Sequence, residues 1–223
     1  SDKGGGIYNY SGSAVKLTNS TVSDNTANYG GGIYNNFSTL TITGSAIGGN
    51  SAGSGGGINN TNGAVAITET SFTGNSATGN GGGIYNIDSI TITGSTLSGN
   101  SADSGGGIFN QNVTASITNS TFSGNTALDA SGGAIQSFYA TTTVVGTTVS
   151  GNSALNAAGF LNYHSELILT NSTVSNNGAA ATSGGIANMK SSTLLISNST
   201  VSHNVAAIIG GGVVNSDSRL EMT

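Results

Sequence analysis

The sequence predicts an all-β fold, a parallel β-helix (β-solenoid) with about 25 residues per coil, and two observations support this prediction. First, a short phrase ending in Asn recurs at steps of 25 or 27 residues along the chain. Second, apolar residues within each repeat are spaced two apart, which is the period of a strand. We call the recurring residue the marker Asn, and it occurs at Asn25, Asn50, Asn75, Asn100, Asn125, Asn152, Asn177 and Asn204. The pattern predicts eight full coils and a partial ninth, and residues 1–223 form a single domain because no linker interrupts it.

Apolar columns at fixed offsets from the marker Asn predict three short strands in each coil. Positions ten and eight residues before the marker form one strand, as Val15 and Leu17 do, and position three residues before it forms another, as Val22 does. The third strand follows a Gly cluster and has the form apolar-x-Asn. Ala stands two residues after each marker Asn, where a small side chain suits a tight corner. One repeat cannot bury its apolar face alone, so successive coils must stack in register.

The composition excludes several classes of protein and site. The chain has only 4 basic and 9 acidic residues, and the basic ones are too few to neutralise phosphates, so we expect no nucleic-acid partner. Without Cys there can be no disulfide bond and no thiolate metal site. No apolar run approaches the length of a membrane span, so we expect no membrane insertion by this segment.

The two recurring phrases resemble the paired motifs of chlamydial polymorphic outer-membrane proteins and related bacterial surface proteins. The first motif of those families is present as Gly132-Gly133-Ala134-Ile135, and the second as Phe72-Thr73-Gly74-Asn75 and Phe122-Ser123-Gly124-Asn125. The resemblance covers nearly the whole chain. It implies a right-handed β-helical passenger of the autotransporter type, exposed outside a bacterial cell and used for adhesion or as a stalk.

The marker Asn column is expected to have a structural role. Asn tolerates left-handed backbone conformations at turns, and its amide can hydrogen-bond to the equivalent amide of the next coil. A second column, interrupted by Ser137, receives the same interpretation, and it comprises Asn9, Asn35, Asn60, Asn86, Asn110, Asn162, Asn188 and Asn215.

Aromatic residues form a candidate binding surface. The residue between the inward apolar residue and Asn in the first motif should point outward, and several such residues are aromatic. An exposed aromatic stripe could stack on sugar rings or on a partner protein, although aromatic residues also shield sheets and pack along their own ladder. The candidate residues, from this column and the position two residues further on, are Tyr8, Tyr10, Tyr34, Tyr85, Phe109, Phe138 and Tyr163.

Threonine residues form an alternative surface. Their Thr-x-Thr spacing is found on the flat ice-binding faces of β-solenoids, although Thr also simply suits an exposed strand. Lys16, Ala66, Ile168 and Leu195 interrupt the array. The candidate ladder comprises Thr41, Thr43, Thr68, Thr91, Thr93 and Thr118.

Catalysis is not expected, and no catalytic residue, metal ligand or cofactor is assigned. Polysaccharide lyases and hydrolases with β-helices need clustered carboxylates, whereas the acidic residues here fall in different columns and mostly on different coils. The nearest approach to a cluster is His164 and Glu166 with Lys190, which we interpret as surface charge.

Neither end of the sequence has the segment that normally covers a solenoid edge. The chain is therefore expected to be a slice of a longer protein or a subunit that stacks end to end. The leading hypothesis is a non-enzymatic extracellular rod on a bacterial surface, with host or matrix glycans or proteins as partners. The alternatives are a filament that binds itself end to end, and an ice-binding solenoid.

Overall fold

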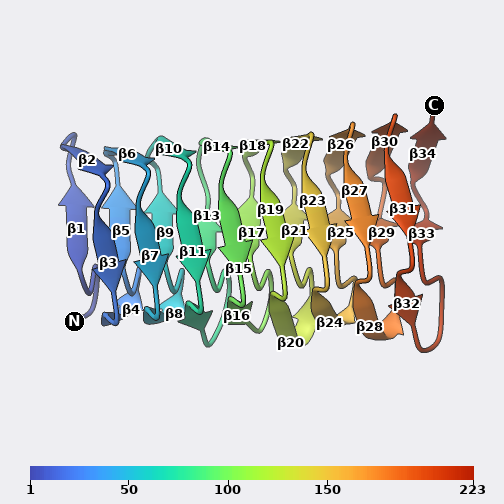
Figure 1. Ribbon diagram of the computed structural model, residues 1–223, viewed down its shortest axis with the longest axis horizontal. Coiled ribbons are helices and arrows are strands. Elements are labelled where there is room, and N and C mark those ends of the chain that lie inside the picture. Colours follow the sequence, from blue (N-terminus) through green and yellow to red (C-terminus); the bar gives the residue numbers. More distant parts are fainter.

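The computed structural model describes the backbone of residues 1–223 and every side chain except that of Ala130. The chain winds into a parallel β-solenoid of about nine turns, and the described residues form strands and no helix. Figure 1 shows the strands of successive coils side by side along the long axis, with the two termini at opposite ends of the rod. The predicted fold class is confirmed.

Each coil contributes strands to four parallel sheets, which we number by their order in the chain. The first sheet contains β1 (Ile7–Tyr10), β5 (Ile33–Asn36), β9 (Ile58–Thr61), β13 (Ile84–Asn86), β17 (Ile108–Gln111), β21 (Ile135–Phe138), β25 (Phe160–Tyr163), β29 (Ile186–Met189) and β33 (Val213–Ser216). The second contains β2 (Ala14–Thr18), β6 (Thr39–Thr43), β10 (Val65–Thr68), β14 (Ile90–Thr93), β18 (Thr114–Thr118), β22 (Thr141–Val145), β26 (Glu166–Thr170), β30 (Thr193–Ser197) and β34 (Arg219–Met222).

The strands of the other two sheets lie on either side of the marker Asn. The third sheet contains β3 (Thr21–Ser23), β7 (Ala46–Gly48), β11 (Ser71–Thr73), β15 (Thr96–Ser98), β19 (Thr121–Ser123), β23 (Thr148–Ser150), β27 (Thr173–Ser175) and β31 (Thr200–Ser202). The fourth contains β4 (Thr26–Tyr29), β8 (Ser51–Ser54), β12 (Ser76–Ala77), β16 (Ser101–Ala102), β20 (Thr126–Ser131), β24 (Ser153–Asn156), β28 (Gly178–Thr182) and β32 (Val205–Ala206).

The fourth sheet corrects the prediction of three strands per coil. The Ala expected at a corner lies within a strand instead, since Ala27 pairs with Ala52 in parallel register. Some strands of this sheet are very short, as β12 and β16 have two residues each. Such a strand has a single inward residue, so it leaves no alternating pattern from which it could be predicted.

The core consists of aliphatic and aromatic ladders that run along the axis of the rod. Ile42, Ile67 and Ile92 occupy one register position in neighbouring coils, and each is at most 1% exposed. Phe72 and Phe122 lie fully buried in the ladder of the third sheet. Because each inward position repeats from coil to coil, burial of this kind is available only after neighbouring coils have stacked.

Glycine clusters allow the chain to turn from the fourth sheet to the first. A Cβ atom at Gly31 would lie 2.6 Å from the carbonyl oxygen of Gly56 in the next coil, which is closer than any side chain tolerates. Gly30 has φ 64°, a left-handed conformation that glycine adopts without strain. The repeated glycines are therefore required by the close approach of successive coils.

Candidate functional site

The marker Asn side chains form a continuous amide ladder between the third and fourth sheets. Asn50 Nδ2 donates to Asn75 Oδ1 at 3.0 Å and to the carbonyl oxygen of Val22 at 2.9 Å. The backbone N–H of Asn50 also donates to Asn75 Oδ1, at 3.1 Å. The same contacts recur from Asn25 to Asn204, and the inner members of the ladder are at most 1% exposed. These side chains satisfy one another and the turn, so they are not available to a ligand.

The second Asn ladder lies inside the first sheet and is interrupted in the middle. Asn35 Nδ2 donates to Asn60 Oδ1 at 2.8 Å, and similar bonds extend the ladder in both directions. At the interruption, Ser137 bonds instead to the hydroxyl of Thr142, with an O···O distance of 2.8 Å. Asn110 Nδ2 and Asn162 Oδ1, on the two sides of Ser137, have no hydrogen-bond partner. Buried groups without a hydrogen-bond partner lower the stability of the fold, and these two flank the coil that carries the site described below.

The aromatic column follows the outer face of the first sheet, but it is not the open stripe that was expected. Tyr8 and Tyr10 are exposed, whereas Tyr34 and Phe109 are each 7% exposed. Tyr85, Phe138 and Tyr163 lie between these extremes. The expectation of exposure was wrong for Tyr34 and Phe109, because the rings of Tyr8 and Tyr85 stack on theirs. Lys3 Nζ also lies 5.3 Å from the centroid of the Tyr34 ring.

Neighbouring rings of this column also stack on one another along the rod. The ring centroids of Tyr8 and Tyr34 are 5.6 Å apart, and those of Tyr85 and Phe109 are also 5.6 Å apart. Phe138 and Tyr163, from the adjacent position, stack at 5.3 Å. Burial raises the pKa of the Tyr85 hydroxyl above its ordinary value of 10.0. Most of the column therefore shields the sheet, and its ring faces are occupied by neighbouring rings.

The threonine column lies on the outer face of the second sheet. Thr43, Thr68, Thr93 and Thr118 are in register on consecutive coils and are partly exposed. Thr41 and Thr91 are also in line, but Ala66 stands between them. Ice binding by this array stays a prediction, which thermal hysteresis measurements on Thr43→Tyr and Thr93→Tyr would test.

Among the described side chains, no group of three or more His, Asp and Glu residues is placed to hold a metal ion. Lys190 Nζ lies 3.9 Å from Asp217 Oδ2, and both side chains are mostly exposed. No helix in the described part of the chain is long and apolar enough to cross a membrane.

A different set of residues stands out at the turn between the first and second sheets, which we call the variable corner. In eight coils this turn has one or two residues with a left-handed φ, and the chemical type of the first one changes from coil to coil. Elsewhere, left-handed turn positions are mostly Gly, Asn or Asp. The residues of the variable corner are Ser11, Phe37, Asn62, Asn112, Tyr139, His164, Lys190 and Asp217.

Two neighbouring members of the variable corner carry stacked rings. The Tyr139 and His164 rings are 4.9 Å apart and inclined by only 4°, and the Tyr139 side chain is 53% exposed. Each ring also has an edge contact, Tyr139 with Phe138 at 4.7 Å and His164 with Tyr163 at 4.8 Å. The four rings form one cluster over two coils, in which Phe138 and Tyr163 also stack on each other.

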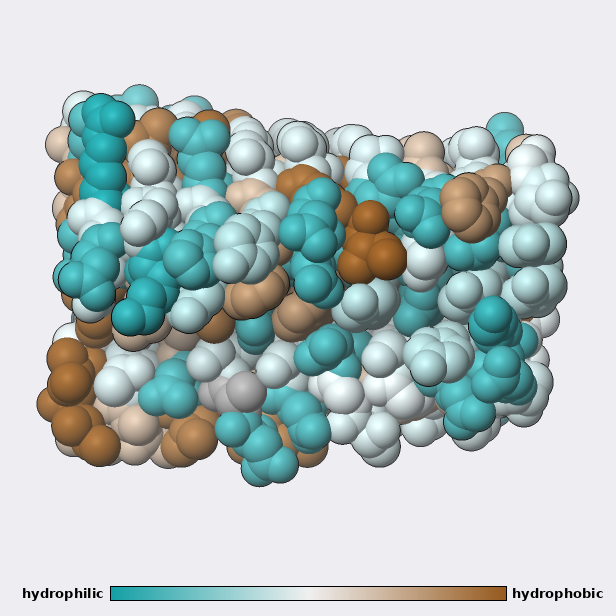
Figure 2. Space-filling model, turned by 180° about the vertical axis from the view of Figure 1, so that it is seen from behind, coloured by the Kyte–Doolittle hydropathy of each residue, from teal (hydrophilic) through white to brown (hydrophobic). Residues whose placement is uncertain are grey.

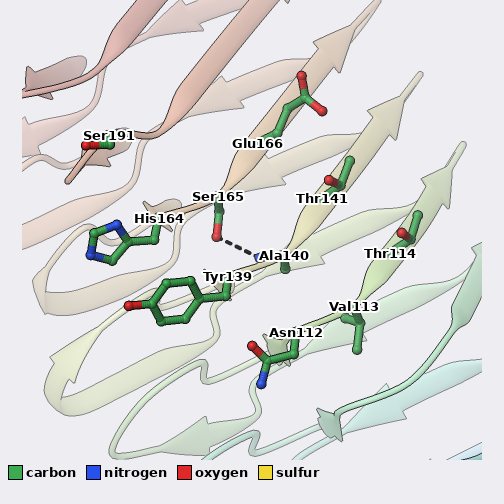
Figure 3. Close-up of a pocket in the computed structure, with 10 residues that line it drawn as sticks. All are labelled: Asn112, Val113, Thr114, Tyr139, Ala140, Thr141, His164, Ser165, Glu166 and Ser191. Carbon is green, nitrogen blue, oxygen red and sulfur yellow. Dashed lines mark hydrogen bonds between the residues drawn. The ribbon is translucent and has the colours of Figure 1, made fainter.

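A depression of about 450 Å³ adjoins this cluster, and we call it the corner groove. Figure 3 shows the Tyr139 and His164 rings side by side on neighbouring turns, while Thr114, Thr141 and Glu166 project from the adjacent strands. Ser165 Oγ accepts a hydrogen bond from the backbone N–H of Ala140 at 2.9 Å, which ties the two turns together. Asn112 and Ser191 line the groove from the coils on either side.

The corner groove combines flat ring surfaces with hydroxyl, amide and carboxylate groups, and none of its lining residues is Lys or Arg. Such a surface can bind a ligand by stacking and hydrogen bonding. The sequence had singled out His164 and Glu166, but only as surface charge, and Tyr139 was missed. A signal was available, since two neighbouring coils have Tyr and His at a turn position where two other coils use Asn.

The rest of the surface is mixed in character. Figure 2 shows the molecule from behind, with a hydrophobic patch at the end of the rod that holds the C-terminus. Val205, Ile208 and Ile209, near the C-terminus, are exposed. Elsewhere on this face the hydrophobic patches are small and separated by hydrophilic ones.

Comparison with known proteins identifies the repeat. The family model of the Chlamydia polymorphic membrane protein repeat matches residues 69–87 and 119–137. Each matched segment begins at the turn before a strand of the third sheet and extends to the first sheet, so it includes both sequence motifs. No curated protein and no solved structure shows a significant match to the chain. The chain thus contains two segments that match this repeat, within a β-solenoid, and the resemblance inferred from the sequence is confirmed.

Proposed function

We propose that the chain is part of a non-enzymatic rod on the outside of a bacterial cell, where it presents a surface for adhesion. The observation that carries the proposal is the match of two coils to the Chlamydia polymorphic membrane protein repeat, within a solenoid that continues in register on both sides. The repeat and the β-solenoid fold together support the interpretation that the chain is a surface-associated, adhesin-like repeat protein.

The architecture suits a rigid spacer that displays its turns. Parallel ladders join every coil to the next, and the marker Asn ladder adds side-chain hydrogen bonds through the buried turn. In a solenoid each coil contacts mainly its neighbours, so length can grow without altering the core. The exposed turns can then vary in sequence while the rod remains intact, which is the property that a display scaffold requires.

Labelling of intact cells tests the location. Antibodies raised against the purified chain are expected to bind source cells without permeabilisation. A cytoplasmic protein stained in parallel should become visible only after permeabilisation. If the antibodies label only permeabilised cells, the proposed function is wrong.

Adhesion by the isolated rod tests the activity. Beads coated with the purified chain are expected to adhere to host-cell or extracellular-matrix layers more than beads coated with an unrelated β-solenoid. Equal adhesion of the two kinds of bead would leave the chain as a passive spacer and contradict the adhesive part of the proposal. Electron microscopy of the same preparation would show whether the chains stack end to end.

A further inference from the structure

The variable corner places aromatic rings where the backbone disfavours them. Tyr139 has φ 52° and His164 has φ 48°, and a left-handed conformation is uncommon for bulky residues. Asn62 and Asn112 occupy the equivalent turns of other coils, and Asn tolerates this conformation well. Strained residues of this kind cluster at functional sites, where the side chain is needed for its chemistry.

The two strained rings are also held in a fixed arrangement. Each is stacked on the other at 4.9 Å and touches a further ring at its edge. The backbone N–H groups of Tyr139 and His164 donate to carbonyl oxygens of the next coil, at 3.2 and 3.3 Å. Stacking covers one face of each ring, but Tyr139 is still 53% exposed, so the uncovered part of the pair forms a preorganised platform on the surface of the rod.

The remaining lining of the corner groove is polar and almost neutral. It offers the Asn112 amide, the Thr114 and Thr141 hydroxyls and the Glu166 carboxylate, which can accept hydrogen bonds from hydroxyl groups. Without Lys or Arg in the lining, a sulfated or carboxylated ligand would find no compensating charge. The groove is also too polar and open to favour the apolar side chain of a partner protein.

We propose that the corner groove binds a neutral, linear saccharide, with one pyranose ring stacked on the Tyr139–His164 platform and its hydroxyl groups bonded to Glu166 and Asn112. The groove crosses four consecutive coils, from Asn112 to Ser191, at a strand spacing of about 4.8 Å per coil. A sugar ring in an extended, equatorially linked chain advances by a similar distance, so neighbouring sugars meet neighbouring coils. This inference rests on the proposed function and names the ligand class for the adhesive surface.

Calorimetric titration of the purified chain with cellohexaose and chitohexaose tests the inference. Both are flat, neutral chains, so at least one is expected to bind, while coiled maltohexaose and a heparin-derived hexasaccharide bind at least tenfold more weakly. Tyr139→Asn is expected to lower the affinity by about tenfold or more, because it removes the stacking surface. The substitution places at the turn the residue that Asn112 already provides in the preceding coil, so the fold should be kept.

Phe37→Asn is the matched control. Phe37 is a member of the variable corner, 60% exposed and with φ 49°, and no other described ring stacks on it. It lies outside the corner groove, so its replacement should leave the affinity unchanged. Equal effects of the two substitutions would show that binding does not depend on the platform, and the inference would be wrong.

Histidine resonances provide a second, independent readout. The chain has only two His residues, so Nuclear Overhauser and chemical-shift changes of each ring can be followed separately. Addition of the bound hexasaccharide is expected to shift the ring signals of His164 and leave those of His203 in place. Shifts confined to His203, or binding without any shift of His164, would contradict the proposed location.

The outcomes separate this inference from the proposed function. If neither flat hexasaccharide binds, or if the heparin fragment binds best, the saccharide inference is wrong. Cell-surface labelling and bead adhesion would then still support the rod. If antibodies label only permeabilised cells while Tyr139-dependent sugar binding persists, the proposed function is wrong and the saccharide site stands.

Discussion

Two turns of the same coil differ in how strictly their sequence repeats from one coil to the next. The marker turn carries Asn in every full coil, and its inner members are buried and hydrogen-bonded to the coils above and below. The expected left-handed backbone of the marker Asn is not observed, because the left-handed residue of that turn is the one before it, as Gly49 is before Asn50. At the variable corner the left-handed residue itself differs between coils, and it is Phe37, Tyr139 or His164 in three of them. The difference lies in what each side chain contacts. A buried amide must match its copies in neighbouring coils, whereas an exposed side chain has no such constraint.

The comparison shows where a repeat protein can acquire a functional site without loss of its fold. A substitution in the marker turn leaves unsatisfied donors and acceptors in two adjacent coils, so repetition is enforced by burial. A substitution in the variable corner changes only the surface of one coil. Function is therefore expected to concentrate where the periodic pattern is broken outside the core, as it is at Tyr139.

The largest expected effect is the loss of one marker amide. Asn100→Ala removes the acceptor of the Asn75 amide and the donor to Phe72 and Asn125, all in the buried interior. We expect the free energy of unfolding to fall by about 3–5 kcal/mol, measured by urea denaturation. Asn112→Gly in the variable corner is the control and should change stability by less than about 1 kcal/mol. Similar losses for both substitutions would remove the distinction between the turns.

Repair of the interrupted ladder should give the next largest effect, in the opposite direction. Ser137→Asn combined with Thr142→Val would supply an acceptor to Asn110 Nδ2 and a donor to Asn162 Oδ1, which now lack partners. We expect the double variant to gain about 1–3 kcal/mol in unfolding free energy by the same measurement. Thr142→Val alone removes the hydroxyl partner of Ser137 and should be destabilising. A double variant less stable than the natural chain would contradict this explanation of the interruption.

A smaller effect is expected from relief of backbone strain in the variable corner. Tyr139→Asn and Tyr139→Ala both remove the stacked ring, but only Asn suits φ 52°. Tyr139→Asn should therefore be more stable than Tyr139→Ala by about 1 kcal/mol in urea denaturation. If Tyr139→Ala is the more stable variant, the left-handed backbone does not strain residue 139. Strain then gives no argument for a function of the Tyr139 ring.

The smallest effect concerns alkaline pH and the half-buried Tyr85. Because burial raises its pKa above 10.0, the unfolded chain loses this proton before the folded chain as the pH rises. The contribution of Tyr85 to stability is thus constant below pH 10.0 and is lost as the pH rises through its folded-state pKa. Tyr85→Phe should flatten the fall in stability above that pH, and the phenolate absorbance difference between the two chains gives the pKa directly. If the stability of the natural chain and that of Tyr85→Phe depend on pH in the same way, the raised pKa of Tyr85 is contradicted.

The periodic part of the molecule was predictable, and the reasons are specific. Ile42, Ile67 and Ile92 share an offset from the marker Asn, and a shared offset in a solenoid means a shared ladder. The fourth strand was missed because Ala27 is the only inward apolar residue in its strand that repeats. The burial of Tyr34 was missed because it depends on the Tyr8 ring and the Lys3 ammonium group, which lie near the Tyr34 ring only once the coils have stacked.

The sequence by itself determined the coil length, the stacking register, the inward ladders and the two Asn columns, because each is a repeated pattern of neighbouring coils. Tertiary structure alone decided which outward residues stay accessible. Tyr34 and Tyr139 are both aromatic and both lie outside the main apolar cluster, yet one is 7% exposed and the other 53% exposed. The angle between sheets, and the side chains that meet across it, are not encoded in any single repeat, so the corner groove could be recognised only in three dimensions.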